Sequence, residues 1–460
     1  MNSILHKIAN PLYLLIWLGL SVFMAIHHEP FSDEAQAYLI ARDASLFDII
    51  TDVARAEGHP LLWYIWLKIW LLFKIDYSYI SFASLIPSFL GVWLFIKKAP
   101  FPPLVLYLFP LTYFIFYQYS IVARGYSFLL LFISLAAIYY PKRKEHPWLY
   151  IIILMLLGQI EIYTFILAGG IFALGLYEDW KAKEVNIKIV SMMIIYAALV
   201  ITMLFPDLNN QYLSYISIPQ VITVNTIRTL TCGLITSICF DFNEPIYLIF
   251  GATYFFALFI ELFNIYRKET IFLLLPIIFF SCYAYKLWHS GLVILIMMLG
   301  IWLNPEKKLS RELKALIILL FGIQLIWSIK AFITDKNEHY SVGKDVSDFL
   351  VVRNIPLSRV QRLQFSTTSF CPYYNDKSCS YWDWHKYSYE IRIERKNMTQ
   401  YDAFIINEDR YRGKPPFWDI NQKDFGFALK IFKSDQFVTD YDISKDETLY
   451  VYYRERTDEK

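Results

Sequence analysis

The chain has 460 residues, of which 57% are hydrophobic and 18% are charged, and its mean hydropathy is +0.38. Soluble domains usually contain about a quarter charged residues, so this composition excludes an ordinary soluble protein. The net charge is only +2, and no general affinity for nucleic acid is therefore expected. Long apolar runs recur along residues 1–331, which predicts a polytopic membrane protein.

The apolar runs alternate with short basic clusters, which belong on the cytoplasmic side of a membrane. The first run follows Lys7 and has no small-residue cleavage site after it, so we expect a retained span and a cytoplasmic N-terminus. The clusters are Lys97-Lys98, Lys142-Arg143-Lys144, Lys181/Lys183/Lys188, Arg267-Lys268, and Lys307-Lys308 with Arg311 and Lys314. Placing all of them inside predicts about eleven helices, near residues 8–26, 79–96, 103–118, 126–140, 148–161, 163–178, 189–205, 246–264, 271–285, 291–303 and 314–331.

Two further apolar stretches do not fit as spans, because counting either one would place later basic loops outside. Residues 60–73 carry Trp63, Trp66 and Trp70 at helical spacing, which favours an interfacial helix. Residues 221–240 are expected on the outer side as a re-entrant or surface segment. The large first loop, residues 27–78, is then also expected on the outer side.

The tail, residues 332–460, has ordinary polarity and follows the membrane domain 1–331. Residues 342–355 predict an amphipathic helix, and residues 359–365, 401–407 and 448–455 predict strands. We expect a small extracytoplasmic α/β domain. The sequence CPYYNDKSC allows a disulfide between Cys371 and Cys379 in an oxidising compartment, with two free thiols as the alternative.

Two adjacent carboxylates, Asp33 and Glu34, follow the first span in the stretch FSDEAQAYLIARD. The simplest interpretation is that Ser32 or Asp33 caps a short helix, which stabilises it by about 1 kcal/mol. However, the topology brings further polar groups to the same side of the membrane, where ionisable groups usually mark a site or pathway. These groups are His59 before Pro60, Arg124 between Tyr119 and Tyr126, Glu161 in a turn between spans, and Lys286 with His289 at another helix end. For Arg124 the alternative is a snorkelling anchor.

An acid pair that faces cationic groups is typical of one kind of chemistry. A sugar linked to a lipid phosphate needs cations at the phosphate, because charge develops there as the sugar leaves. The acceptor hydroxyl needs a carboxylate to take its proton. The acid pair, the His-Pro and the Tyr-x-x-x-x-Arg-x-Tyr stretch resemble the polytopic GT-C glycosyltransferases, and above all the protein O-mannosyltransferases and lipid A aminoarabinose transferases. The resemblance covers roughly residues 10–140 by motif.

The resemblance implies roles for four residues. Asp33 matches the base of the family and Glu34 its neighbour, so both are expected to be catalytic. His59 matches the His of the His-Pro motif, and it is expected with Arg124 to bind the polyprenyl phosphate. The chain departs from the family at Leu61, where a second Pro is common, and it lacks an arginine before the next span. Topology alone adds Lys286 and His289 to the phosphate site, and Glu161 and Tyr126 as further outer-face polar groups.

The expected function is an inverting glycosyltransferase of a bacterial inner membrane. Its partners would be a polyprenyl-phosphate-sugar donor, membrane lipids and a lipid, glycan or protein acceptor. No cofactor is expected with certainty. Some relatives bind a divalent metal at the acid pair, for which Asp33, Glu34 and His59 offer ligands. The alternatives are a flippase or transporter of lipid-linked sugar, a surface polysaccharide polymerase or ligase, and a non-catalytic scaffold.

Overall fold

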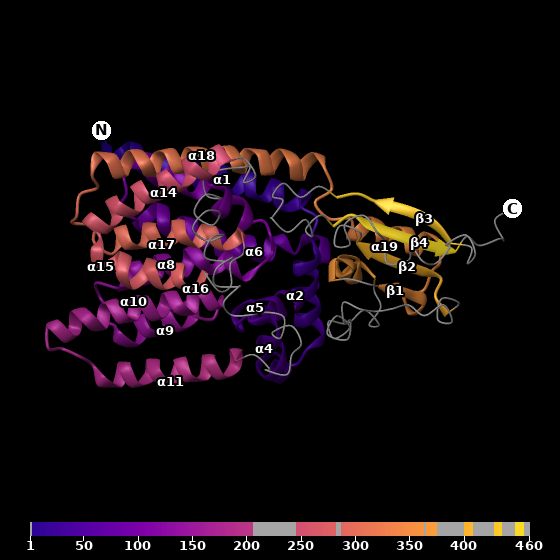
Figure 1. Cartoon of the computed structure of the whole chain (residues 1–460), viewed down its shortest axis with the longest axis horizontal. Coiled ribbons are helices and arrows are strands. Elements are labelled where there is room, and N and C mark those ends of the chain that lie inside the picture. Colours follow the sequence, from indigo (N-terminus) through magenta and orange to yellow (C-terminus); the bar gives the residue numbers. More distant parts are fainter. Residues whose placement is uncertain are drawn as a thin grey trace.

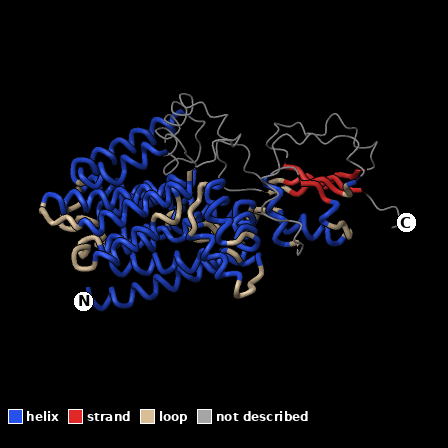
Figure 2. The backbone as a smooth tube through the Cα atoms, turned by 90° about the horizontal axis from the view of Figure 1, so that it is seen from below, coloured by secondary structure: helices blue, strands red, loops and turns tan. Residues whose placement is uncertain are grey.

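The computed structural model describes residues 2–205, 245–281, 287–362, 365–374, 400–407, 427–434 and 447–454. A bundle of helices forms one part of the molecule, and a small domain with a sheet lies at one end of it (Figure 1). Figure 2 shows the same two parts from a second direction, with the helical part and the strands at opposite ends. The predicted segment 221–240 lies outside the described residues.

Five helices of the described part are long and apolar enough to cross a membrane. Another helix, α14 (Pro245–Ile265), meets the following helical segment at a bend of 118°, and the two count as a sixth span if they cross together. These helices support a multi-pass membrane protein. The five are α1 (Asn2–His27), α6 (Ser81–Lys98), α10 (Ile162–Lys181), α11 (Ile187–Leu204) and α18 (Arg311–Asn337).

The remaining expected spans form shorter helices, so eleven complete crossings are not shown. Three of them are α8 (Leu129–Tyr139), α9 (Pro147–Leu157) and α17 (Ser290–Trp302). All but one residue of α17 are buried, as expected for a helix that is apolar all round and packs inside protein. The span expected at 271–285 is described to residue 281 and consists of η7 (Thr270–Leu274) and α16 (Leu275–Ser281), after α15 (Arg267–Glu269).

The segment expected as a helix at 103–118 is broken. It forms α7 (Pro103–Leu108), a 3₁₀ turn η3 (Phe109–Leu111) that contains Pro110, and a π-helical turn η4 (Phe114–Gln118). Proline removes a backbone donor and disfavours a continuous helix. Residues 113–123 are buried throughout, and irregular backbone within a membrane protein is tolerated where protein covers it. The break places Arg124 on an irregular chain segment between helical elements.

The loop between α1 and α6 is largely helical. It contains α2 (Ser32–Asp43), α3 (Leu46–Asp48), η1 (Ile49–Val53), α4 (Ala54–Glu57), α5 (Leu62–Leu71) and η2 (Tyr77–Tyr79). The helix predicted at 60–73 is confirmed as α5, with Trp63 and Trp70 buried and Ile65 and Ile69 exposed. Its position along the membrane surface stays a prediction.

The tail contains α19 (Gly343–Val352), η9 (Leu357–Arg359), η10 (Phe365–Tyr373) and a sheet of four described strands. The strands are β1 (Val360–Arg362), β2 (Ala403–Asn407), β3 (Phe427–Phe432) and β4 (Leu449–Arg454), in the order β1-β2-β4-β3. The β1–β2 pair is parallel and the other pairs are antiparallel. The predicted helix and three predicted strands are confirmed, whereas β3 was not predicted. The preceding helix α18 runs to Asn337 and so includes the first residues assigned to the tail.

The first loop and the tail share one hydrophobic core. Leu39 and Ile40 of α2 and Tyr64 of α5 pack in the same buried cluster as Leu350 of α19 and Val451 of β4. Burial of apolar side chains at this boundary stabilises the contact. Because the two parts pack together, they lie on the same side of any membrane that the helices cross.

The basic loops gather at the other end of the bundle. Figure 1 shows α15 and the connection between α10 and α11 at the end far from the sheet. Arg143, in the basic loop after α8, lies at the same end, because its Nη2 is 3.0 Å from a carboxylate oxygen of Glu178 in α10. The Nζ of Lys307 lies 3.5 Å from Glu269. That this end faces the cytoplasm stays a prediction from the positive-inside rule.

One cysteine, Cys371, lies among the described residues, and it is disulfide-bonded. Cys379 lies outside the described residues. The disulfide excludes two free thiols. Pairing with Cys379 stays a prediction.

Orientation can be tested with two exposed positions, Arg55 in the first loop and Glu145 in the basic loop after α8. We expect a membrane-impermeant thiol reagent to label Arg55→Cys in intact spheroplasts and to label Glu145→Cys only after lysis. The unsubstituted chain measures labelling of the native cysteines. Labelling of Glu145→Cys but not Arg55→Cys in intact cells would reverse the orientation.

Candidate active site

The two neighbouring carboxylates at the start of α2 point to different surroundings. Glu34 is fully buried. Its Oε2 accepts a hydrogen bond from the Phe31 N–H at 2.9 Å and lies 3.1 Å from His28 Nε2, and its Oε1 accepts from the Ala123 N–H at 2.5 Å. The Asp33 side chain, by contrast, is 26% exposed. Of the pair, Asp33 alone has the access that a reacting carboxylate needs.

The expectation that Ser32 or Asp33 caps α2 is wrong. The N-cap residue is Phe31, which makes no side-chain capping bond, and the helix begins at Ser32. The Asp33 carboxylate instead pairs with Arg124, with Oδ2 at 3.0 Å from Nη1. A negative side chain in the first turn also interacts favourably with the helix dipole, but the ion pair gives Asp33 a second role that capping does not explain.

Arg124 is held on extended backbone just before the 3₁₀ turn η5 (Gly125–Phe128). Its guanidinium carbon lies 4.8 Å from the centroid of the Trp288 ring and 5.4 Å from that of Tyr126. The side chain is 12% exposed. A snorkelling anchor would extend its charge into water, whereas this charge is stacked on rings and faces a carboxylate.

The Arg124–Asp33 contact is close but not well aligned. Although the two atoms are 3.0 Å apart, the buried Nη1 has no hydrogen bond of acceptable geometry to any described residue. Hydrogen bonds weaken steeply as the angle closes. The guanidinium edge therefore retains donor capacity for an anionic ligand.

A second acid–base pair joins His59 and Glu161. The His59 Nδ1 lies 2.6 Å from Glu161 Oε2. Gly58 precedes the histidine at φ +69, a conformation that favours glycine, and it ends α4. Glu161 directly precedes α10, where its N–H donates to the Thr164 hydroxyl at 2.9 Å. Burial lowers the pKa of His59, but the Glu161 carboxylate outweighs it and the net pKa is raised. A raised pKa favours the imidazolium at neutral pH.

Glu57 and Gln36 complete this group and were not predicted. The Gln36 Nε2 donates to Glu57 Oε1 at 2.7 Å. Burial is the main cause that raises the pKa of Glu57 to about 7; Asp33 acts in the same direction, and His59, Gln36 and Arg124 act against it. Gln36 lies three residues after Asp33 and shares its helix face. That spacing was the available sequence signal.

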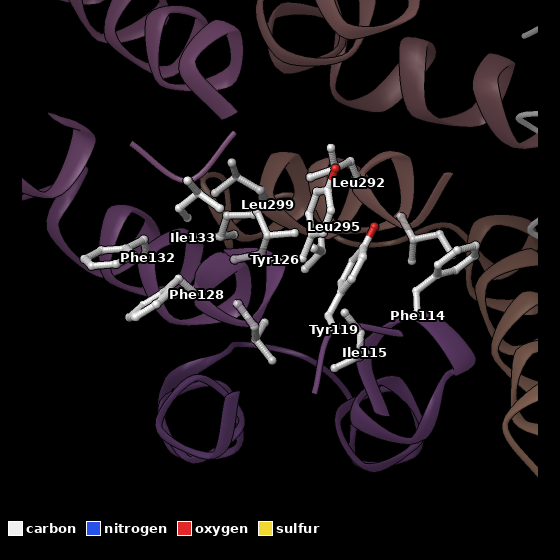
Figure 3. Packing of buried hydrophobic residues seen from close by; sticks show 14 of the residues in the cluster. Phe114, Ile115, Tyr119, Tyr126, Phe128, Phe132, Ile133, Leu292, Leu295 and Leu299 are labelled. Atoms are coloured by element: carbon white, nitrogen blue, oxygen red, sulfur yellow. The ribbon is translucent and has the colours of Figure 1, made fainter. Parts of the chain in front are cut away.

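Tyr126 connects the group to the buried end of α17. Its hydroxyl lies 3.0 Å from His289 Nε2, and its ring stacks on Tyr119 at 5.3 Å between centroids. Figure 3 shows Tyr119 and Tyr126 beside Leu292 and Leu295. Gly291 allows this approach, because a Cβ there would lie 2.5 Å from the Tyr119 hydroxyl. The Tyr119 hydroxyl donates to the backbone carbonyl of Trp288, the residue whose ring stacks on Arg124.

The structure brings together most of the predicted site residues. Asp33 and Arg124 form one pair, His59 and Glu161 form the other, and Tyr126 contacts Arg124. His289 is buried behind Tyr126 and against the ring of Tyr163, 4.1 Å away. It contacts the site through Tyr126. Lys286 lies outside the described residues.

Glu34 belongs to a separate buried network. His28 lies between two carboxylates, 3.1 Å from Glu34 and 3.0 Å from Asp335 near the end of α18. The network joins α1, α2 and α18 behind the site. His28 and Asp335 were not predicted, because contacts over such sequence separation leave no local pattern. We assign Glu34 a positioning role in place of the expected catalytic one.

A metal held by Asp33, Glu34 and His59 does not fit this geometry. Within the described residues, no group of three or more His, Cys, Asp or Glu side chains is arranged to hold a metal ion. Both oxygens of Glu34 already accept backbone N–H groups on the buried side. We derive no step through a metal.

No protein-family model, curated protein or solved structure matches the chain. The function of this chain must therefore be inferred from its residues and their geometry.

The His59–Glu161 pair makes a prediction about pH. If protonated His59 is needed for activity, activity falls as pH rises through its pKa. Glu161→Gln removes the carboxylate that raises the pKa of His59. Burial, which lowers that pKa, is then no longer outweighed. We expect the alkaline limb of the pH–rate profile to move to lower pH in Glu161→Gln. An unchanged limb would show that His59 is not the group that titrates.

Proposed function

We propose that the chain is a GT-C-type membrane glycosyltransferase that moves a sugar from a polyprenyl-phosphate donor to an acceptor on the outer side of the membrane. The Asp33–Arg124 pair carries the proposal. A partly exposed carboxylate, which follows the long helix α1, faces a guanidinium that is stacked on two rings. Such a site suits a substrate that combines a lipid, a phosphate and a hydroxyl.

In the proposed reaction, the acceptor oxygen forms a bond to the anomeric carbon of the sugar, and the bond from that carbon to the phosphate oxygen breaks. The acceptor proton passes to Asp33 as general base. The polyprenyl phosphate leaves with the bonding electron pair and gains negative charge. Arg124 stabilises this charge through its guanidinium fork, and protonated His59 adds a second positive charge. Attack opposite the leaving group inverts the anomeric centre.

Binding of the donor phosphate to Arg124 would release Asp33 from the ion pair. Arg124 Nη1 lies 3.0 Å from Asp33 Oδ2. A bound phosphate competes for the same guanidinium edge, because both groups are anionic acceptors. Moving Arg124 toward the phosphate breaks its contact with Asp33 and leaves that carboxylate free to accept a hydrogen bond from the acceptor hydroxyl. Donor binding then precedes proton removal from the acceptor.

The membrane part and the tail have distinct roles in this proposal. The basic loops lie in the cytoplasm and the site faces outward, in a bacterial inner membrane. The tail packs on α2 through the shared core and so lies beside the bound acceptor. Glu34 accepts a hydrogen bond from the N–H of Ala123, the residue before Arg124. It thereby keeps Arg124 close to Asp33, which precedes Glu34 in α2.

Mass spectrometry of envelope glycans tests the proposal. A strain without the protein is expected to lack one sugar modification and to accumulate the lipid-linked sugar on the outer face of the membrane. Complementation with the wild-type chain restores the modification, and Asp33→Asn does not. Accumulation on the cytoplasmic face would instead indicate a flippase. Identical glycans in all strains would refute a glycosyltransferase role.

A further inference from the structure

The tail places a buried carboxylate at the start of the helix that carries Asp33. Glu447, just before β4, is 2% exposed. Its Oε1 accepts a hydrogen bond from the Ser32 N–H at 2.7 Å, and its Oε2 accepts one from the Ser341 hydroxyl at 2.8 Å. Ser341 stands between α18 and α19. One side chain therefore ties together α2, the start of the tail and the sheet.

The bonded N–H is one that α2 cannot satisfy by itself. The first N–H groups of a helix have no partner within the helix, and the N-cap residue Phe31 has no side-chain acceptor. Two carboxylates replace the missing cap: Glu34 accepts from the Phe31 N–H, and Glu447 accepts from the Ser32 N–H. A carboxylate at this position also interacts favourably with the helix dipole. The second of these partners comes from another domain.

Keeping a carboxylate at this position has a cost. Burial raises the pKa of Glu447 to about 8, and the hydrogen bonds from Ser32 and Ser341 act in the opposite direction. Asp33, the residue after Ser32, raises this pKa as well. A buried polar group is costly unless it is hydrogen-bonded. The two oxygens of Glu447 accept hydrogen bonds from α2 and from the segment before α19, which indicates a role in placing α2.

Other contacts keep the tail in a fixed position against the loop. Apolar residues of α2 and α19 share a core, and the Tyr77 and Tyr373 rings lie 4.9 Å apart between centroids. The His339 Nδ1 lies 2.9 Å from a Glu29 carboxylate oxygen, on an exposed side chain. That last contact also joins tail to loop, but it does not touch α2. It provides a matched control.

We propose that Glu447 is a positioning residue, through which the tail holds the first turn of α2 so that Asp33 faces Arg124. The tail thus completes the active site and is more than a cover over it. The effect on sugar transfer rests on the proposed function. The effect on α2 does not.

The test compares Glu447→Ala, Glu447→Gln and His339→Ala in the full-length chain in lipid nanodiscs. Hydrogen exchange is followed in the peptide that covers residues 29–38, together with melting temperature and transfer kinetics. We expect Glu447→Ala to speed exchange in this peptide about tenfold or more, because the Ser32 N–H loses its acceptor. We expect its kcat to fall about 10- to 100-fold with little change in the donor KM, as for a misplaced catalytic group.

Glu447→Gln retains a carbonyl oxygen for the Ser32 N–H, so exchange and kcat should remain near the wild-type values. His339→Ala should change neither. Unchanged exchange in Glu447→Ala, or equal kcat losses in Glu447→Ala and His339→Ala, would overturn the proposal. If Glu447→Ala does not fold, a Glu447→Gln variant with fast exchange at residues 29–38 overturns it too. Absence of transfer by the wild-type chain counts against the proposed function alone, since exchange still reports on α2.

Discussion

Asp33→Asn is expected to lower the rate of sugar transfer by about 10²–10⁴-fold, which is the usual contribution of a general base. Asparagine has nearly the same size, and Asp33 is not the N-cap of α2, so α2 should still form. The change removes the charge that accepts the proton and the charge that pairs with Arg124. The measurement is kcat with a saturating lipid-linked donor, together with melting temperature.

Asp43→Asn is the matched control, because Asp43 lies at the opposite end of the same helix and pairs with Arg42 on the surface. It removes the same charge without touching the site, and exposed ion pairs contribute about 1 kcal/mol or less. Transfer by Asp43→Asn should match the wild type. Near-normal transfer by Asp33→Asn would remove Asp33 from the role of base, and Glu57 would become the candidate to test.

The candidate site could be predicted where topology alone determines which residues meet. Asp33, His59, Arg124 and Glu161 each follow or precede an apolar run, so counting spans brings them to one side. The structure adds that they form two ion pairs. The sequence does not separate the roles of Asp33 and Glu34. Adjacent residues on a helix point in directions about 100° apart, and one of the two backbone donors that bind Glu34 belongs to the distant Ala123.

Other site residues could not be predicted, because they act through contacts between distant segments. Glu447 reaches Ser32 across 415 residues, and His28 reaches Asp335 across 307. No local periodicity reports such a pair. Glu57 could not be predicted for a different reason. A glutamate in a polar loop is usually a solvated surface charge, and nothing in the sequence indicates its contact with Gln36.

In the fold, too, some elements follow from local sequence patterns and others do not. The tail helix α19 and the strands β2 and β4 follow from their apolar patterns, since β2 is buried throughout. β3 was missed, because its middle residues are exposed and it pairs only with β4 among the described strands. In the membrane part, hydropathy located helices but not their lengths. Short apolar helices such as α17 are buried by protein, so a length rule based on lipid thickness does not apply to them.

Arg124→Lys is expected to lower transfer at least about tenfold, and Arg124→Ala about 10²–10³-fold, which is typical of removing a group that stabilises developing charge. Lysine retains the charge but has neither the planar fork nor the flat face that stacks on Trp288 and Tyr126. Both kcat and the donor KM should change, because the phosphate binds before it gains charge. Steady-state kinetics across a donor titration measures the two effects separately.

Arg42→Lys is the control for this prediction, since Arg42 pairs with Asp43 on the surface of α2, and it should leave the kinetics unchanged. Tyr126→Phe removes the hydroxyl that lies 3.0 Å from His289 but keeps the ring beside the guanidinium, so it should give a smaller loss in the same direction. Tyr119→Phe should act similarly, because its hydroxyl anchors the Trp288 carbonyl. The result that would contradict this role is wild-type kinetics of Arg124→Lys over the whole donor range. Arg124 would then only hold Asp33 in place, and His59 would become the candidate phosphate ligand.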